Sequence, residues 1–138
     1  MLADNTYLGI LRAAINVQTG EPHTDWRKSY VNRKGLIVID PSHSVPGKYV
    51  VYLFMPFYNY FHTSRGDLQI SEKKIRIETV HSIYEFEIEP GCVPEEEIPF
   101  LQAEAEWYFT GKAQIGDFYF PQSPEYVEAA SCQRLKKG

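Results

Sequence analysis

The four histidines are the residues best suited to acid–base chemistry, because an imidazole changes its charge near neutral pH. Three of them fall in turn-rich segments and one follows a run of aromatic residues: His23, His43, His81 and His62. No glycine-rich phosphate loop, zinc-protease histidine pair, Cys-x-x-Cys or Gly-x-Ser-x-Gly motif accompanies them. We therefore predict no catalytic residue, no metal site and no cofactor. A small hydrolase that uses His62 or His43 with a glutamate stays as an alternative.

Acidic side chains are concentrated in one stretch of the chain. Residues 77–111 contain nine glutamates and no lysine or arginine, although the whole chain has a net charge of only −4. Such an excess of carboxylates can steer a basic partner toward the protein, or it can serve only as a solvated face that maintains solubility. The candidates for contact with a partner are Glu78, Glu85, Glu87, Glu95, Glu96 and Glu97.

A second unusual feature is the aromatic segment that follows Pro56. It contains more rings than a polar loop needs, namely Phe57, Tyr58, Tyr60 and Phe61. One interpretation is a strand end that folds onto the core. The other is an exposed platform that anchors a protein partner through Tyr58, Tyr60 and Phe61. Because Arg65 and the basic loop 27–34 are also available, the same rings suggest stacking on single-stranded nucleic acid as an alternative function.

Alternating apolar residues predict a three-stranded meander over residues 67–89. The first turn pairs Ile70 with Ile75 on an apolar face. A two-residue second turn pairs Glu78 with Glu85, and like charges directly opposite each other destabilise a strand pair. Neither turn contains the Asn-Gly sequence that two-residue loops prefer, so a longer loop stays open.

Continuous apolar runs predict two central strands at residues 35–40 and 48–55. Helical spacing predicts a helix within residues 95–109, although the end of that segment can instead pair as a strand. A serine N-cap followed by proline predicts a last helix that starts at Ser123. Residues 1–17 fit either a strand or a helix.

These elements predict the α+β class, with a mainly antiparallel, twisted sheet and one or two helices, the last near the C-terminus. With 138 residues, 43% of them hydrophobic, the chain is expected to form a single domain over residues 1–138. No apolar run spans a bilayer, and no basic cluster precedes an apolar run at the start of the chain. We therefore expect a cytoplasmic protein that does not bind membranes.

The sequence as a whole favours a non-enzymatic protein-binding domain, such as an inhibitor, an immunity factor or an adaptor. Its expected partner is another protein with a basic surface, which the acidic patch would engage. Nucleic acid is a less favoured partner, because each phosphate contact needs a lysine or arginine and the chain is acidic overall. The identity of the partner and the oligomeric state stay open.

Overall fold

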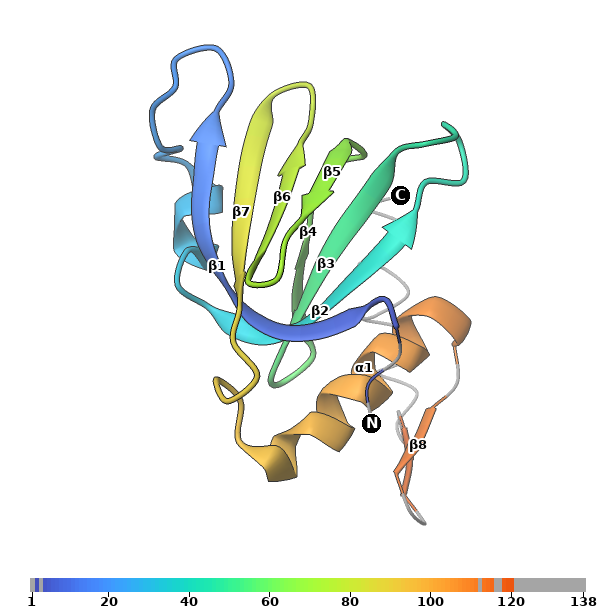
Figure 1. Ribbon diagram of the computed structural model, residues 1–138. Coiled ribbons are helices and arrows are strands. Elements are labelled where there is room, and N and C mark those ends of the chain that lie inside the picture. Colours follow the sequence, from blue (N-terminus) through green and yellow to red (C-terminus); the bar gives the residue numbers. More distant parts are fainter. Residues whose placement is uncertain (1, 3, 112, 116–117, 121–138) are drawn as a thin grey trace.

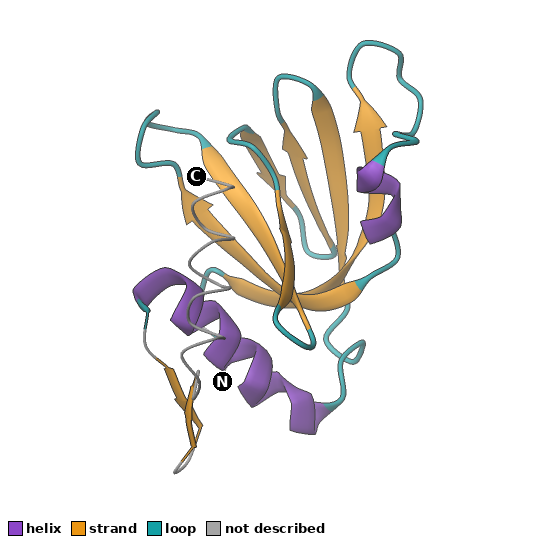
Figure 2. Cartoon of the chain, turned by 180° about the vertical axis from the view of Figure 1, so that it is seen from behind, coloured by secondary structure: helices purple, strands orange, loops and turns teal. Residues whose placement is uncertain are grey.

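The computed structural model describes residues 2, 4–111, 113–115 and 118–120. Within them, seven strands form one antiparallel sheet in the order β4-β3-β2-β1-β7-β6-β5, and an α-helix lies against one face of it (Figures 1 and 2). The strands of this sheet are β1 (Thr6–Asn16), β2 (Lys34–Pro41), β3 (Tyr49–Met55), β4 (Asn59–His62), β5 (Asp67–Ile70), β6 (Lys74–Glu78) and β7 (Ser82–Ile88). The remaining elements are the 3-10 helices η1 (Trp26–Tyr30) and η2 (Glu95–Glu97), the helix α1 (Ile98–Thr110) and the short hairpin of β8 (Ala113–Ile115) and β9 (Phe118–Phe120). This arrangement confirms the predicted α+β class.

The sheet is strongly curved because β1 bends as it passes from β2 to β7 (Figure 1). A register shift between Leu11 and Ala13 marks a β-bulge, which bends a strand and increases its twist. At the bend Gly9 faces Gly35, and a Cβ atom on either residue would lie within 2.3 Å of a backbone oxygen of the next strand. Glycine is therefore needed where these backbones approach most closely.

The concave face of the sheet encloses the larger core. Its buried side chains come from six strands: Leu11, Ala14, Ile37, Ile39, Val51, Leu53, Met55, Phe61, Ile75, Ile77, Tyr84 and Phe86. The segment after β4 returns to β3, where Gly66 and Tyr49 exchange backbone hydrogen bonds of 2.9 and 3.0 Å. Helix η1 lies over this core, with the Tyr30 ring 5.2 Å from the ring of Phe61.

The helix α1 covers the convex face and buries a second core (Figure 2). Leu101 and Ala105 of the helix pack there with residues of β1 to β4, including Leu36 and Phe54. The predicted helix within residues 95–109 is confirmed, except that its first turn is the 3-10 helix η2. No helix in the described part of the chain is long and apolar enough to span a membrane. The predicted helix that starts at Ser123 lies outside the described residues.

The two predicted central strands form as β2 and β3, and the meander over residues 67–89 forms as β5, β6 and β7. Its first hairpin has the expected register, with Ile70 opposite Ile75. The second is shifted by two residues, so Glu78 lies opposite Ile83 and the predicted pairing of two glutamates is wrong.

The second turn lies one residue earlier than expected, because Thr79 and Ser82 pair across Val80 and His81. The Thr79 backbone N–H donates to the Ser82 carbonyl at 2.8 Å, and the Thr79 hydroxyl accepts the Ser82 backbone N–H at 3.0 Å. Every side chain keeps its face of the sheet, because side chains in a strand alternate with a period of two.

Candidate functional site

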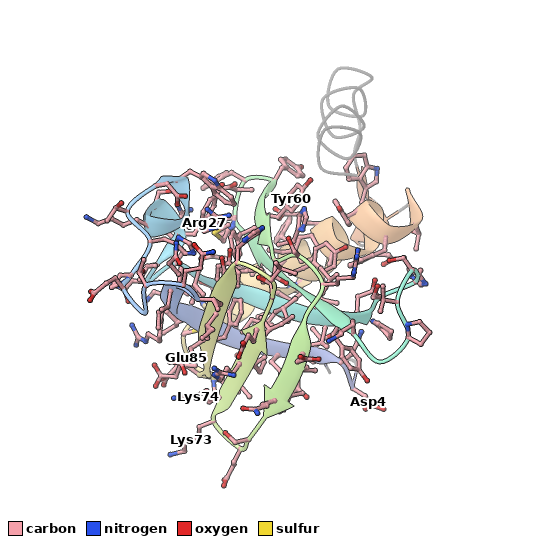
Figure 3. The ribbon with its side chains drawn as sticks, turned by 90° about the horizontal axis from the view of Figure 1, so that it is seen from above. Asp4, Arg27, Tyr60, Lys73, Lys74 and Glu85 are labelled. Atoms are coloured by element: carbon pink, nitrogen blue, oxygen red, sulfur yellow. The ribbon has the colours of Figure 1, made fainter. Side chains whose placement is uncertain are left out.

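Three of the predicted partner-binding glutamates project from β6 and β7 and are paired with basic side chains. Their ion pairs are Arg12–Glu87 at 2.7 Å, Arg76–Glu78 at 3.3 Å, Lys74–Glu85 at 3.8 Å and Arg76–Glu85 at 4.0 Å. Figure 3 shows Lys74 and Glu85 together over β6 and β7, with Tyr60 on the far side of the molecule near α1. Their charge is thus largely balanced by arginine and lysine from β1 and β6.

The other three predicted glutamates, Glu95, Glu96 and Glu97, form the 3-10 helix η2 that leads into α1. Glu95 and Glu96 are exposed and Glu97 is half-buried. Among the described residues, no ion pair involves any of the three. Their position at the start of a helix is electrostatically favourable, because the N-terminal end of a helix carries a partial positive charge.

The three aromatic residues predicted to contact a partner differ in their exposure to solvent. Tyr58 is 38% exposed, but Tyr60 and Phe61 are only 8% and 1% exposed. The Tyr60 ring packs 4.9 Å from that of Tyr108 in α1, and the Phe61 ring lies 5.2 Å from that of Tyr84. The expectation of an exposed platform is therefore wrong for Tyr60 and Phe61, because β4 is covered by α1 on one face and by the main core on the other.

Phe57 is the aromatic residue that this segment exposes, with 93% of its surface accessible. It forms the β3–β4 turn together with Tyr58, and both have left-handed backbone conformations, with φ of 65° and 62°. That conformation costs a residue with a side chain roughly 1–2 kcal/mol, and such strain is concentrated at functional sites. The sequence does not indicate this left-handed turn, because such turns usually contain glycine or asparagine at the positions that Phe57 and Tyr58 occupy.

The turn is held against α1 by Glu104, which the sequence analysis did not select. The Tyr58 backbone N–H donates to Glu104 Oε1 at 3.1 Å, while Glu104 Oε2 has no hydrogen-bond partner among the described residues. Glu104 is only 8% exposed. Burial raises the pKa of its carboxyl from 4.5 to about 7, and the hydrogen bond from Tyr58 opposes that rise only in part. The sequence feature that could have indicated the burial of Glu104 is its position three residues after Leu101, on the apolar face of the predicted helix.

Glu104 faces a cavity of about 370 Å³ between the β3–β4 turn and the start of α1. We call this the Phe57–Glu104 site; its lining residues are Pro56, Phe57, Tyr58, Glu97, Phe100, Leu101 and Glu104. Phe100 is 53% exposed at its edge. A second hollow of about 430 Å³ shares Phe57 and Glu97 with the first and is also lined by Arg33 and Lys34. Phe57 is thus an exposed aromatic ridge that lines both hollows.

The histidines lie elsewhere. His62 and His81 line a hollow of about 560 Å³ together with Arg27, Arg65 and several hydroxyl groups, and no carboxylate lines it. His43 is 3.8 Å from Asp40, but its side chain is 90% exposed. The described residues also contain no group of three or more histidine, cysteine, aspartate or glutamate side chains placed to hold a metal ion.

Comparisons with protein-family models, with curated proteins and with solved structures found no match to this chain. The function of the Phe57–Glu104 site therefore has to be inferred from its own geometry. Three properties distinguish it from the rest of the described surface: a strained turn, an exposed aromatic ridge and a buried carboxyl with one unsatisfied oxygen.

Proposed function

We propose that this protein is a non-enzymatic protein-binding domain, such as an inhibitor, an immunity factor or an adaptor. It docks a partner that combines basic and apolar side chains, and the contact surface is the Phe57–Glu104 site with the adjoining Glu95 and Glu96. The observation that carries this proposal is the exposure of Phe57, which a strained turn holds beside glutamates that form no ion pair within the described part of the chain.

The apolar part of this surface supports a protein partner. Phe57 and Phe100 are large, largely exposed rings on the two sides of one cavity. Aromatic side chains dominate the binding energy of protein interfaces, where they fill pockets at the centre of the contact. A strained turn that exposes a phenylalanine to water gains nothing for folding, and a partner that covers the ring would recover the hydrophobic energy.

The charged part of the surface supports a basic partner. Glu95, Glu96 and Glu97 add three negative charges beside the apolar ridge without a described ion pair. Unpaired charges at the rim of an interface mainly accelerate association and select the partner. Glu78, Glu85 and Glu87 contribute less to this attraction, because Arg12, Lys74 and Arg76 balance them.

The alternative of single-stranded nucleic acid has less support, because Tyr60 and Phe61 are buried. A cytoplasmic location is part of the proposal. Cys92, the one cysteine among the described residues, is a free thiol, as proteins of reducing compartments usually have.

Peptides selected from a random library displayed on phage provide a probe of known chemistry for this surface. We expect the selected peptides to place lysine or arginine next to apolar residues. Phe57→Ser is expected to weaken their binding about tenfold or more, because it removes the apolar anchor. The combined variant E95Q/E96Q/E97Q is expected to slow association and to reduce the dependence of affinity on salt.

The matched control is E78Q/E85Q/E87Q, which removes the same number of charges from the paired face and should bind the peptides as the wild type does. Two results contradict the proposed function. The first is that Phe57→Ser binds the peptides with the same affinity as the wild type. The second is that the control slows peptide association as much as E95Q/E96Q/E97Q does.

A further inference from the structure

The unsatisfied oxygen of Glu104 points to a missing hydrogen-bond donor. A buried polar atom without a partner is rare in folded proteins, since its desolvation is not compensated. Glu104 Oε2 is such an atom, on a side chain that is more than nine-tenths buried and lines the cavity under Phe57. The cavity of about 370 Å³ is large enough for a whole side chain.

The walls of the cavity define what kind of donor fits. They consist of carbon surface from Pro56, Leu101 and three aromatic side chains, together with the carboxyls of Glu97 and Glu104. Among the described residues, no lysine, arginine or histidine lines the cavity. The described residues thus supply no donor to Glu104 Oε2, and the negative charge with the aromatic faces favours a cation as its partner.

We propose that the Phe57–Glu104 site takes the side chain of a lysine of the partner protein, whose ammonium group donates to Glu104 Oε2. The methylene stem of that lysine lies against Phe57 and Phe100. This inference rests on the proposed function, because it assigns the lysine to the docked partner.

Lysine fits better than arginine because Glu104 presents a single acceptor. Its Oε1 already accepts the Tyr58 N–H, so a guanidinium fork would have to share that oxygen, whereas Oε2 accepts no hydrogen bond from the described residues. A guanidinium group gains most of its strength from two parallel hydrogen bonds to both oxygens of a carboxylate. An ammonium group is a compact charge with three donors, of which one suits Glu104 Oε2 and another permits a contact with Glu97.

The binding of an ammonium group also explains how a buried carboxyl can be useful. Burial raises the pKa of Glu104 to about 7, so the empty site holds a proton on a large fraction of molecules near neutral pH. An adjacent cation favours the ionised form and lowers this pKa. Binding of the lysine therefore releases a proton from Glu104.

Small ligands test the site without a known partner. Backbone amide resonances are followed by NMR while n-butylammonium, n-butylguanidinium or the neutral n-butanol is added at a pH of about 8, where Glu104 is mostly ionised. We expect n-butylammonium to shift the amides of Tyr58 and Glu104 saturably, with at least about fivefold higher affinity than n-butylguanidinium. Glu104→Gln should reduce that affinity about fivefold or more, because it removes the charge but keeps an oxygen that accepts from Tyr58.

Glu106→Gln is the matched control: it removes an exposed carboxyl from the same helix and should leave the titration unchanged. The dispersion of the amide resonances reports whether each variant is folded, and Phe57→Gly provides a second variant that weakens binding by removing one wall. The proposal is overturned if n-butylammonium causes no saturable shift up to about 100 mM. It is also overturned if Glu104→Gln binds as the wild type does, or if n-butanol or n-butylguanidinium binds equally well.

These results separate the two proposals. Peptide selection that succeeds while n-butylammonium fails overturns the lysine site and leaves the protein-binding function standing. Saturable n-butylammonium binding by a protein that selects no peptide overturns the role of the partner, and with it the proposed function.

Discussion

The outer face of β6 and β7 and the start of α1 contain glutamates from the same acidic stretch, but the fold treats them differently. On β6 and β7 the antiparallel register places Arg76 opposite Glu85, and Arg12 of β1 reaches Glu87 from the neighbouring strand. Arg33 and Lys34 line the same hollow as Glu97, but no ion pair joins Glu95, Glu96 or Glu97 to a basic side chain among the described residues. The difference teaches that a run of acidic residues becomes an attractive surface only where the surrounding elements leave it unpaired.

The two regions also differ in what their carboxyl groups contribute to stability. The ion pairs of β6 and β7 join side chains that are 29–57% exposed, and such pairs stabilise a protein by about 0–1 kcal/mol each. Glu104 is buried with one unsatisfied oxygen, so its ionised form destabilises the fold.

The largest expected effect is the loss of stability that Glu104 causes as the pH rises. Its pKa is 4.5 in an unfolded chain and about 7 in the fold, so the folded state binds more protons between these values. Its contribution to stability is therefore fully present below pH 4.5 and lost as the pH rises through 7. Relative to Glu104→Gln, the wild type should lose about 3 kcal/mol of unfolding free energy between these limits.

Urea denaturation at pH values from about 4 to 9 measures this difference. Glu97→Gln is the matched control, because Glu97 is the other acid that lines the cavity and it is less buried. An equal pH dependence of the wild type and Glu104→Gln would show that Glu104 is not the group responsible.

A smaller effect is expected where the turn is strained. Phe57→Gly removes the left-handed strain but adds entropy to the unfolded chain, and should leave stability unchanged or raise it by about 0.5 kcal/mol. Val80→Gly, at a residue that is 80% exposed and has no positive φ, should lower stability by about 0.5–1 kcal/mol. Thermal or urea unfolding of both variants gives the comparison. If Phe57→Gly lowered the free energy of unfolding as much as Val80→Gly does, the β3–β4 turn would not be strained.

The smallest effect is expected for the ion pair between Arg12 and Glu87. A double-mutant cycle with Arg12→Ala and Glu87→Ala should give a coupling energy of about 0.3–0.5 kcal/mol, because both side chains are more than a third exposed. The coupling should decrease further in high salt. A value above about 1.5 kcal/mol would mean that the paired face is a stabilising network and not a balanced, solvated surface.

Much of the fold could be predicted because it depends on local patterns. The alternation of Ile75 and Ile77 with charged neighbours indicates both a strand and its buried face, whichever partner it has. The register of the second hairpin could not be predicted with the same certainty. It depends on the hydrogen bonds between Thr79 and Ser82, which centre the turn on Val80 and His81, one residue earlier than the apolar pattern indicates.

The candidate site was predictable only in part. The excess of glutamates in residues 77–111 is visible in the sequence, and so is the concentration of aromatic residues after Pro56. Which ring is exposed was not visible, because Phe57 and Phe61 differ only in their position relative to β4 and α1. Glu104 became significant only when α1 packed against the β3–β4 turn and buried it.

The sequence by itself determined the strand pattern, the apolar faces and the amount of negative charge in residues 77–111. The tertiary structure alone decided which carboxylates meet a cation and which carboxyl is removed from water. The physical reason is distance: ion pairing and desolvation act over a few ångströms through space, and Arg12 and Glu87 lie 75 residues apart in the chain but 2.7 Å apart in the fold.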